Sequence, residues 1–303
     1  MSAPRVIVVV KRSAYRRYVE EEGDPRARRL IRRKDPTVAH WRKAHEEHMR
    51  TVEAVDSALE SFGARALVLK GSHAAFDAAD AALVVAVGGD GTLLAASHNV
   101  GSIPVLGVNS APRFSVGFFC AARRSNLKRM LGNALDGTLE NVRLARMSVS
   151  VNGRIRSKRV LNEALYCHSS PAATSRYLLS HKRIREEHKS SGFWIGPAAG
   201  STAAQRSAGG RILPLRSRKL QLVVREPYPS FGRKYRLSRF LVSPGDRVVA
   251  ESMMTDACMF LDGPYRRIGF GLGDSASFAI SEEPLVVLGL PGKRAPRNAG
   301  SDA

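Results

Sequence analysis

The chain has 303 residues, of which 44% are hydrophobic, and a formal net charge of +21 at pH 7. This length and apolar content predict a sizeable core and two domains, and no apolar stretch approaches the roughly 20 residues needed to span a bilayer. Without a signal-peptide pattern at its start, the chain is expected to be cytoplasmic and to make no membrane contact. The positive charge favours polyanionic partners, namely nucleotides, polyphosphate or nucleic acid, without choosing among them.

The first half of the chain predicts strands alternating with helices. The apolar strand candidates lie at 6–10, 66–69, 83–87 and 103–108. A charged insertion with short helices occupies 11–45, and the three- and four-residue spacing of Met49, Val52, Val55, Leu59 and Phe62 predicts a helix. Ser125 is expected to cap a further helix. Alternation of this kind implies a parallel sheet, so residues 1–140 should form a Rossmann-like α/β domain.

The second half predicts β-structure. Asn152-Gly153 is a strong hairpin signal after the alternating strand 148–151. Further strand candidates lie at 220–224, 240–242, 248–249 and 259–261. We therefore expect an all-β domain over 141–280. The apolar run Leu285–Leu290 is expected to return to the first domain, which residues 281–292 would complete, and 293–303 should be a disordered basic tail.

Several other patterns exclude common sites. Cys120, Cys167 and Cys258 are few, odd in number and far apart, so we expect reduced thiols and no disulfide framework or CxxC metal site. His45 and His48 lack the HExxH spacing and are predicted to be exposed helix residues. The absence of GxxxxGK[ST] excludes an ordinary P-loop ATPase.

The segment Gly88-Gly89-Asp90-Gly91-Thr92 is the most informative, because it joins a buried strand to a helix. Glycines let backbone N–H groups approach a ligand, and the start of a helix favours anions. A carboxylate there repels phosphate unless it binds a metal ion or takes a proton from a hydroxyl nucleophile. Both roles belong to phosphoryl transfer. The alternative is that Asp90-Gly91 is only a tight turn.

Two later segments add weight to this interpretation. Asn162-Glu163 offers donors and a charged acceptor suited to ribose hydroxyls or an adenine edge. The run from Gly200 to Gly210 is rich in small and hydroxyl residues and leaves the backbone open to close approach. The alternatives are a solvent-exposed polar pair and an ordinary loop.

These three segments resemble the NAD kinase family, in the family's order and with suitable spacing, over about residues 45 to 290. The glycine turn alone is shared with diacylglycerol-type lipid kinases and, loosely, with phosphofructokinases; the three together are specific to NAD kinases. Finer features are similar to the animal mitochondrial type of the family. They are the long loop 110–116 after Gly107-Val108-Asn109, Lys189-Ser190-Ser191-Gly192, Arg225-Glu226-Pro227 and Asp256-Ala257-Cys258-Met259.

The resemblance implies transfer of the γ-phosphoryl group of ATP to the 2′-hydroxyl of the adenosine ribose of NAD, or of NADH, giving NADP(H). By motif position Asp90 would be the general base. The residues that would line the phosphate donor with Mg²⁺ are Gly88, Gly89, Gly91 and Thr92. The residues that would bind NAD are Asn162, Glu163, Lys189, Ser191, Thr202, Ala203 and Ser207. No residue is assigned as a certain metal ligand, and a homodimer or homotetramer is implied.

The sequence also departs from the family pattern. Ala204 stands where an aromatic residue usually follows, and Ser191 where a carboxylate is expected, while Lys189 could contact the dinucleotide phosphates. These changes leave the choice between NAD and NADH open, and the use of inorganic polyphosphate beside ATP is open as well. The rival interpretations are a lipid or sugar kinase sharing the glycine turn, and a non-catalytic nucleic-acid-binding protein explained by the charge.

Overall fold

The structure is a computed structural model, and it describes residues 3–71, 74–229 and 234–291. The described part of the chain divides into two compact units: residues up to 142 together with 285–290, and residues 143–284. The tail 293–303, predicted to be disordered, lies outside the described residues. Within the described ranges, no helix has both the length and the apolar character needed to cross a membrane.

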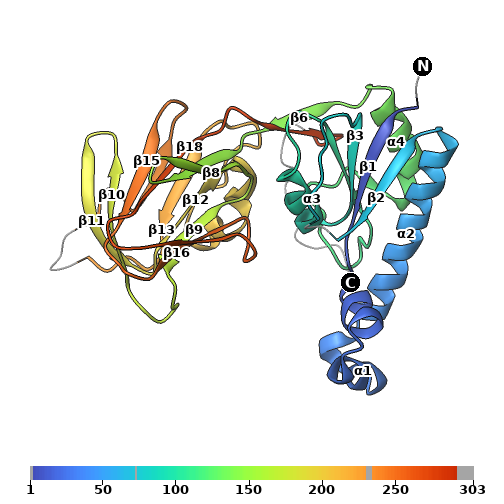
Figure 1. Cartoon of the computed structure of the whole chain (residues 1–303), viewed down its shortest axis with the longest axis horizontal. Helices are drawn as coiled ribbons and strands as arrows, with labels where there is room; N and C mark the ends of the chain where they lie inside the picture. The colour runs from blue at the N-terminus through green and yellow to red at the C-terminus, as the bar shows by residue number, and fades with distance from the viewer. Residues whose placement is uncertain (1–2, 72–73, 230–233, 292–303) are drawn as a thin grey trace. The chain divides into compact units, whose positions relative to one another are not determined.

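The first unit is built on a seven-stranded sheet (Figure 1). Its strand order is β2 (Arg65–Lys70), β1 (Arg5–Val10), β3 (Leu83–Gly88), β4 (Val105–Asn109), β19 (Leu285–Leu288) and β6 (Asn141–Leu144), with the short β5 (Ala122–Arg123) beside β4. The pairs β1–β2, β1–β3, β3–β4 and β4–β19 are parallel. Every residue of β3 is buried, as its unbroken apolar sequence predicts.

Helices cover both faces of this sheet. In Figure 1, α2 (Trp41–Ser61) and α4 (Leu127–Leu135) lie on one face and α3 (Asp90–Ser97) on the other. Residues 16–21 form a π-helical turn, α1 spans Pro25–Arg32, and 36–38 form a 3₁₀ turn, which confirms the predicted short helices. The prediction for Ser125 is wrong: it lies inside a 3₁₀ turn, and the neighbouring Asn126 accepts the Arg123 N–H instead.

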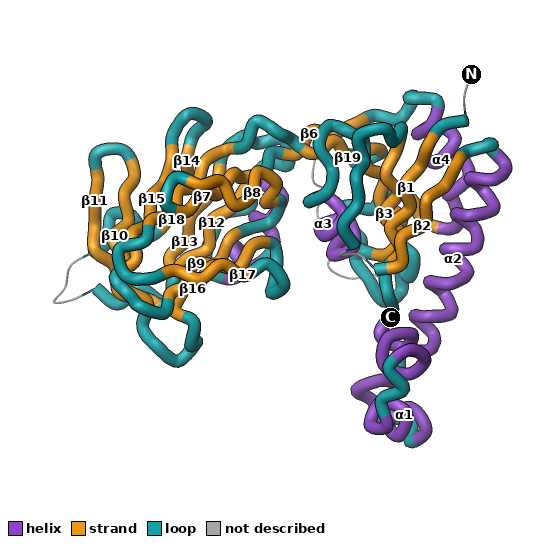
Figure 2. The backbone as a smooth tube through the Cα atoms, in the orientation of Figure 1, coloured by secondary structure: helices purple, strands orange, loops and turns teal. Residues whose placement is uncertain are grey.

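The second unit consists of two six-stranded antiparallel sheets. In Figure 2 most of its regular structure is coloured as strand. One sheet has the order β11 (Ile184–Ser190), β10 (Ser175–His181), β15 (Arg247–Ser252), β18 (Ser275–Ile280), β7 (Met147–Val151) and β8 (Arg154–Val160). The other has the order β14 (Arg239–Val242), β13 (Leu220–Val224), β12 (Phe193–Pro197), β9 (Ala164–His168), β16 (Ala257–Leu261) and β17 (Arg267–Phe270). Their facing side chains form one core, in which Tyr166, Tyr177, Phe193 and Phe278 are fully buried.

Two local predictions in this unit have different outcomes. Asn152 (φ 48°) and Gly153 (φ 76°) join β7 to β8 with two left-handed residues, which confirms the predicted hairpin. The cysteines are free, but they are not all separate in space: Cys167 and Cys258 stand directly opposite each other on β9 and β16, with sulfurs 3.8 Å apart. Burial raises the pKa of the Cys167 thiol to about 12.

Candidate functional site

The glycine turn lies at the carboxyl end of β3, and Asp90 is the first residue of α3. A Cβ on Gly88 would collide with Oγ1 and Cβ of Thr92, so close packing requires glycine there, whereas a Cβ on Gly89 would collide only with the Ser115 hydroxyl, which can rotate away. A Cβ on Gly91, in contrast, would meet nothing within 4 Å. The turn is therefore tightly packed against the protein at its start and open where the helix begins, at the end that favours anions.

The Asp90 carboxylate is held by the loop that follows β4. One oxygen accepts the Phe118 N–H at 2.9 Å and the other accepts the Phe119 N–H at 2.7 Å. A carboxylate has about four acceptor positions, so this leaves roughly two for a ligand. Sequence reasoning missed this anchoring contact. It orients the side chain and also means that Asp90 has a structural role besides any chemical one.

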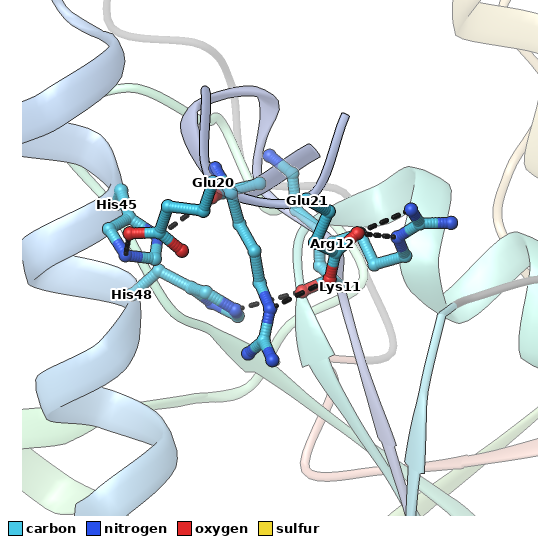
Figure 3. Close-up of polar contacts among 8 residues, drawn as sticks. Lys11, Arg12, Glu20, Glu21, His45 and His48 are labelled. Atoms are coloured by element: carbon cyan, nitrogen blue, oxygen red, sulfur yellow. Dashed lines mark hydrogen bonds and ion pairs between the residues drawn. The ribbon is translucent and has the colours of Figure 1, made fainter. Parts of the chain in front are cut away.

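His48 of α2 lines the same cavity as Gly88, and Figure 3 shows its ring directed toward Lys11. Its side chain is buried, with 3% exposed, so the predicted exposure is wrong. Nε2 lies 3.0 Å from the Lys11 carbonyl oxygen, which can only accept, and Nδ1 lies 2.8 Å from Ser110 Oγ. The ring therefore donates from Nε2 and accepts at Nδ1. Burial lowers the pKa of His48 to about 4, so the ring is neutral near pH 7.

This histidine joins the ends of the strands that carry the turn. Lys11 follows β1 and donates its N–H to Val87 of β3, while Ser110 follows β4 and donates its N–H to the Gly88 carbonyl. His48 links Lys11 to Ser110 and thereby holds in place the residue whose N–H bonds to Gly88. A cavity of about 100 Å³ adjoins the turn here. Its lining includes Lys11, Ser13, His40, Gly88, Ser110 and Ser115.

The charged insertion lies over the same corner of the first unit. Glu21 forms ion pairs with both Arg12 and Arg16 (Figure 3). The Lys11 side chain is exposed, and no described residue forms an ion pair with its ammonium group. Lys11 is therefore available to an anion bound beside the glycine turn.

A second group of polar residues lies in the β unit, immediately before β9. Asn162 Oδ1 and Glu163 Oε2 are buried and have no hydrogen-bond partner among the described residues. Burial, helped by the negative charge of Asp262, raises the pKa of Glu163 to about 8. A Cβ on Gly196 or on Gly200 would collide with the Asn162 carbonyl oxygen, so these glycines pack directly on the segment.

Two residues that sequence reasoning missed hold this segment in place. The Asp262 carboxylate accepts backbone N–H groups from residues 161–163. Gln205 is fully buried and donates from Nε2 to the Asn162 carbonyl at 3.2 Å. The only sequence signals were an Asp-Gly pair after a strand for Asp262 and a lone glutamine in the small-residue run for Gln205.

The remaining predicted residues fall into two places. Thr202 ends the turn 198–202, Ala203 joins it to the short α5 (Ala204–Ser207), and Ser207 ends that helix; Gln205 of this stretch contacts Asn162. Lys189 and Ser191 lie toward the other end of β9, since Phe193 pairs with Tyr166 and Ile195 with Ala164.

The length of β9 separates these two places by about 13 Å at ~3.3 Å per residue. Lys189 and Ser191 line a different groove, of about 400 Å³, together with Arg176 and Tyr228. Within one chain, they are therefore not brought beside Asn162 and Glu163.

The described residues contain no group of three or more His, Cys, Asp and Glu side chains placed to hold a metal ion. Mg²⁺ differs from ions held in all-protein cages, because it usually keeps several waters and binds through one or two carboxylates together with substrate phosphates. The single carboxylate of the glycine turn fits such an ion when the phosphates bring the remaining ligands.

Comparisons with known proteins agree with this architecture. The family model described as "ATP-NAD kinase N-terminal domain" matches residues 3–138. A "Probable NADH kinase" of Oryza sativa subsp. japonica is 35% identical over 234 residues, covering 70% of this chain and 72% of the relative. An "NADH kinase" of Arabidopsis thaliana is 34% identical over 234 residues, with 68% and 72% covered.

Among solved structures, the crystal structure of an NAD kinase from Archaeoglobus fulgidus in complex with ATP superposes with a TM-score of 0.67 at 21% identity. It covers 93% of this chain and 92% of that one. The predicted fold class, a parallel-sheet α/β domain followed by an all-β domain, is confirmed.

Proposed function

The chain belongs to the NAD kinase family, and on this premise we propose that it transfers the γ-phosphoryl group of ATP to the adenosine-ribose 2′-hydroxyl of NAD or NADH. The observation that carries the proposal is the pair of buried oxygens Asn162 Oδ1 and Glu163 Oε2, neither of which has a hydrogen-bond partner among the described residues. Each unpaired group costs about 1–3 kcal/mol. A ligand that forms hydrogen bonds with both recovers this cost. Family membership disfavours the lipid or sugar kinase interpretation.

The acceptor would bind through its adenosine part. The adenine amino group donates a hydrogen bond and the ribose hydroxyls both donate and accept, so adenosine can pair with the Asn162 oxygen and with the Glu163 carboxyl group in its protonated form. Thr202, Ala203 and Ser207, in the stretch whose Gln205 contacts Asn162, would contact more of the dinucleotide. Lys189 and Ser191, at the far end of β9, would reach only a part of the ligand distant from the adenosine.

The donor would bind at the glycine turn. The first N–H groups of α3, the open space at Gly91, the Thr92 hydroxyl and the Lys11 ammonium all suit phosphate oxygens. Mg²⁺ would come with the donor and neutralise part of its charge, held mainly by phosphate oxygens and water. Catalysis would consist mainly of positioning and charge stabilisation.

Asp90 would accept the proton of the 2′-hydroxyl as a general base. The Phe118 and Phe119 N–H groups fix its orientation and leave acceptor positions free. A positioned general base contributes typically 10²–10⁴-fold to rate. The contribution of Asp90 should lie in that range.

The test is NADP(H) formation by wild type, Asp90→Asn and Asp80→Asn, with NAD or NADH as acceptor and ATP or polyphosphate as donor. Asp80 is a surface carboxylate of the same unit, 82% exposed, and serves as the matched control. Each protein's thermal midpoint is recorded, because the new amide in Asp90→Asn points an N–H₂ at a backbone N–H.

The proposal is supported if folded Asp90→Asn loses turnover while Asp80→Asn keeps it. No turnover by wild type with any pairing would overturn it. If the protein then retains nucleic acid in a salt-sensitive way, and Asp90→Asn does so equally, the result would favour a non-catalytic nucleic-acid-binding protein.

The preferred acceptor is a finer question. The two relatives at 35% and 34% identity are both named NADH kinases, which supports NADH as an acceptor at least as good as NAD. Comparison of kcat/KM for the two forms tests this directly. Three expectations stay predictions: the cytoplasmic location, the homodimer or homotetramer, and the animal mitochondrial-type subgroup. Sedimentation of the purified chain would test the oligomeric state.

A further inference from the structure

Asp262 binds the segment that precedes β9 through several hydrogen bonds at once. Its Oδ2 accepts the Leu161 N–H at 2.8 Å, and its Oδ1 accepts the Asn162 and Glu163 N–H groups at 2.7 and 3.2 Å. Its own N–H donates to the Glu163 carbonyl at 2.9 Å. The backbone of the two adenosine-binding candidates is thus fixed by one residue that lies about a hundred positions away in the sequence.

The strand register explains why Asp262 stands there. Leu261 at the end of β16 pairs with Ala164 at the start of β9, so the residue after one strand meets the residue before the other. Asp262 (φ 51°) and Gly263 (φ 109°) both adopt left-handed backbone conformations that turn the chain at this point. Aspartate tolerates this conformation better than most residues, and a strained turn persists only where surrounding contacts determine it.

The charges around Glu163 come from several elements. Asp262, which follows β16, raises the proton affinity of Glu163. Arg146 before β7 interacts electrostatically with Asp262, and also with Arg159 of β8 and Glu283 after β18. Arg146 is buried and donates to the Glu283 carbonyl, while Arg159 pairs with the Glu283 carboxylate at 2.8 Å. Asp262 is the charged group that acts on Glu163 itself.

We propose that Asp262 is a positioning residue for the dinucleotide acceptor, holding Asn162 and Glu163 in the backbone geometry that presents their side chains to the adenosine. This inference rests on the proposed function. It adds a second consequence: because Asp262 is negative, it also sets the pH at which Glu163 loses its proton, and therefore the pH at which acceptor binding changes.

The test uses two substitutions that each remove a different property of Asp262. Asp262→Asn keeps an oxygen for two of the three N–H groups but removes the charge, whereas Asp262→Glu keeps the charge and displaces the oxygens. We expect both to weaken NAD(H) binding, measured as Kd by calorimetry and as KM, by about tenfold, with kcat within about twofold. The midpoint of the pH dependence of Kd should move to lower pH in Asp262→Asn only.

Asp274→Asn is the matched control. Asp274 also accepts a backbone N–H in this unit, from Gly271 at 2.7 Å, and does not act on Glu163. Its substitution should leave Kd and the midpoint unchanged. In a Glu163→Gln background, Asp262→Asn should produce no midpoint at all.

Asp262→Asn and Asp262→Glu proteins that keep the wild-type Kd would overturn the inference, as would a loss confined to kcat. If Asp262→Asn does not fold, Asp262→Glu still provides the Kd. A wild type that binds NAD(H) but transfers no phosphate would contradict the proposed function and leave the positioning role measurable.

Discussion

Substitution of Glu163 by glutamine should stabilise the β unit while it impairs acceptor binding. Burial and Asp262 raise the pKa of Glu163 from 4.5 to about 8, so the folded protein holds this proton more tightly than the unfolded chain does. The stabilising effect of the bound proton is complete below about pH 4.5 and is lost as the pH rises through about 8. Glutamine resembles the protonated acid in shape and stays neutral throughout.

The size of the effect follows from the pKa difference. At 1.36 kcal/mol per pH unit, an ionisable Glu163 lowers the free energy of unfolding by about 2 kcal/mol at pH 6 and about 4 kcal/mol at pH 8, relative to a side chain that stays neutral. The wild type should therefore lose about 2 kcal/mol more than Glu163→Gln between these two pH values. This change with pH is independent of how well the glutamine amide itself fits.

The two tryptophans, Trp41 and Trp194, allow the β unit to be followed alone. In a Trp41→Phe background, the fluorescence of Trp194 on β12 reports urea unfolding of that unit. Glu187→Gln, at an exposed position of β11, is the control. An identical pH dependence in wild type and Glu163→Gln, or a variant less stable at pH 8 than at pH 6 relative to wild type, would refute the reasoning.

The other predictions concern the first unit. Lys11→Met should raise the KM for ATP about tenfold and leave that for NAD(H) unchanged, because it removes one charge-assisted contact; Lys70→Met, at the end of the neighbouring strand, is the control. His48→Leu should leave the Lys11 carbonyl unpaired, while the Ser110 hydroxyl can still donate to the Gly88 carbonyl. The substitution should lower stability by about 1–3 kcal/mol and raise the KM for ATP, and an unchanged KM would exclude a role of His48 in holding the turn. Because the pKa of His48 is lowered from 6.5 to about 4, its stabilising effect is present above pH 6.5 and lost as the pH falls through about 4. His48→Gln should flatten that part of an acid-unfolding curve. Chelation of divalent cations by EDTA should abolish turnover and leave NAD(H) binding intact.

Features encoded locally could be predicted from the sequence. The unbroken apolar run of β3 and the Asn152-Gly153 turn each determine their structure within a few residues. His48 was mispredicted although its signal was present: it lies four residues before Val52 and seven before Val55, on the same buried helical face. Two glutamates beside it made that part of the helix look exposed.

Features that depend on pairing across the chain could not be predicted. The contact of Asp262 with Asn162 and the meeting of Cys167 with Cys258 both follow from the β9–β16 register. No pattern near any of these residues contains that register. The same holds for Phe118 and Phe119, whose backbone N–H groups, not their side chains, hold Asp90.

The first sheet has a consequence for synthesis of the protein. β19 lies between β4 and β6 in this sheet, yet it follows the whole β unit in the chain. A ribosome must therefore release about 285 residues before the sheet can close. Until then the edges of β4 and β6 that await β19 are open to wrong pairing, which is the condition under which nascent chains aggregate or engage chaperones. Truncation just before β19 should thus damage the unit that was synthesised first.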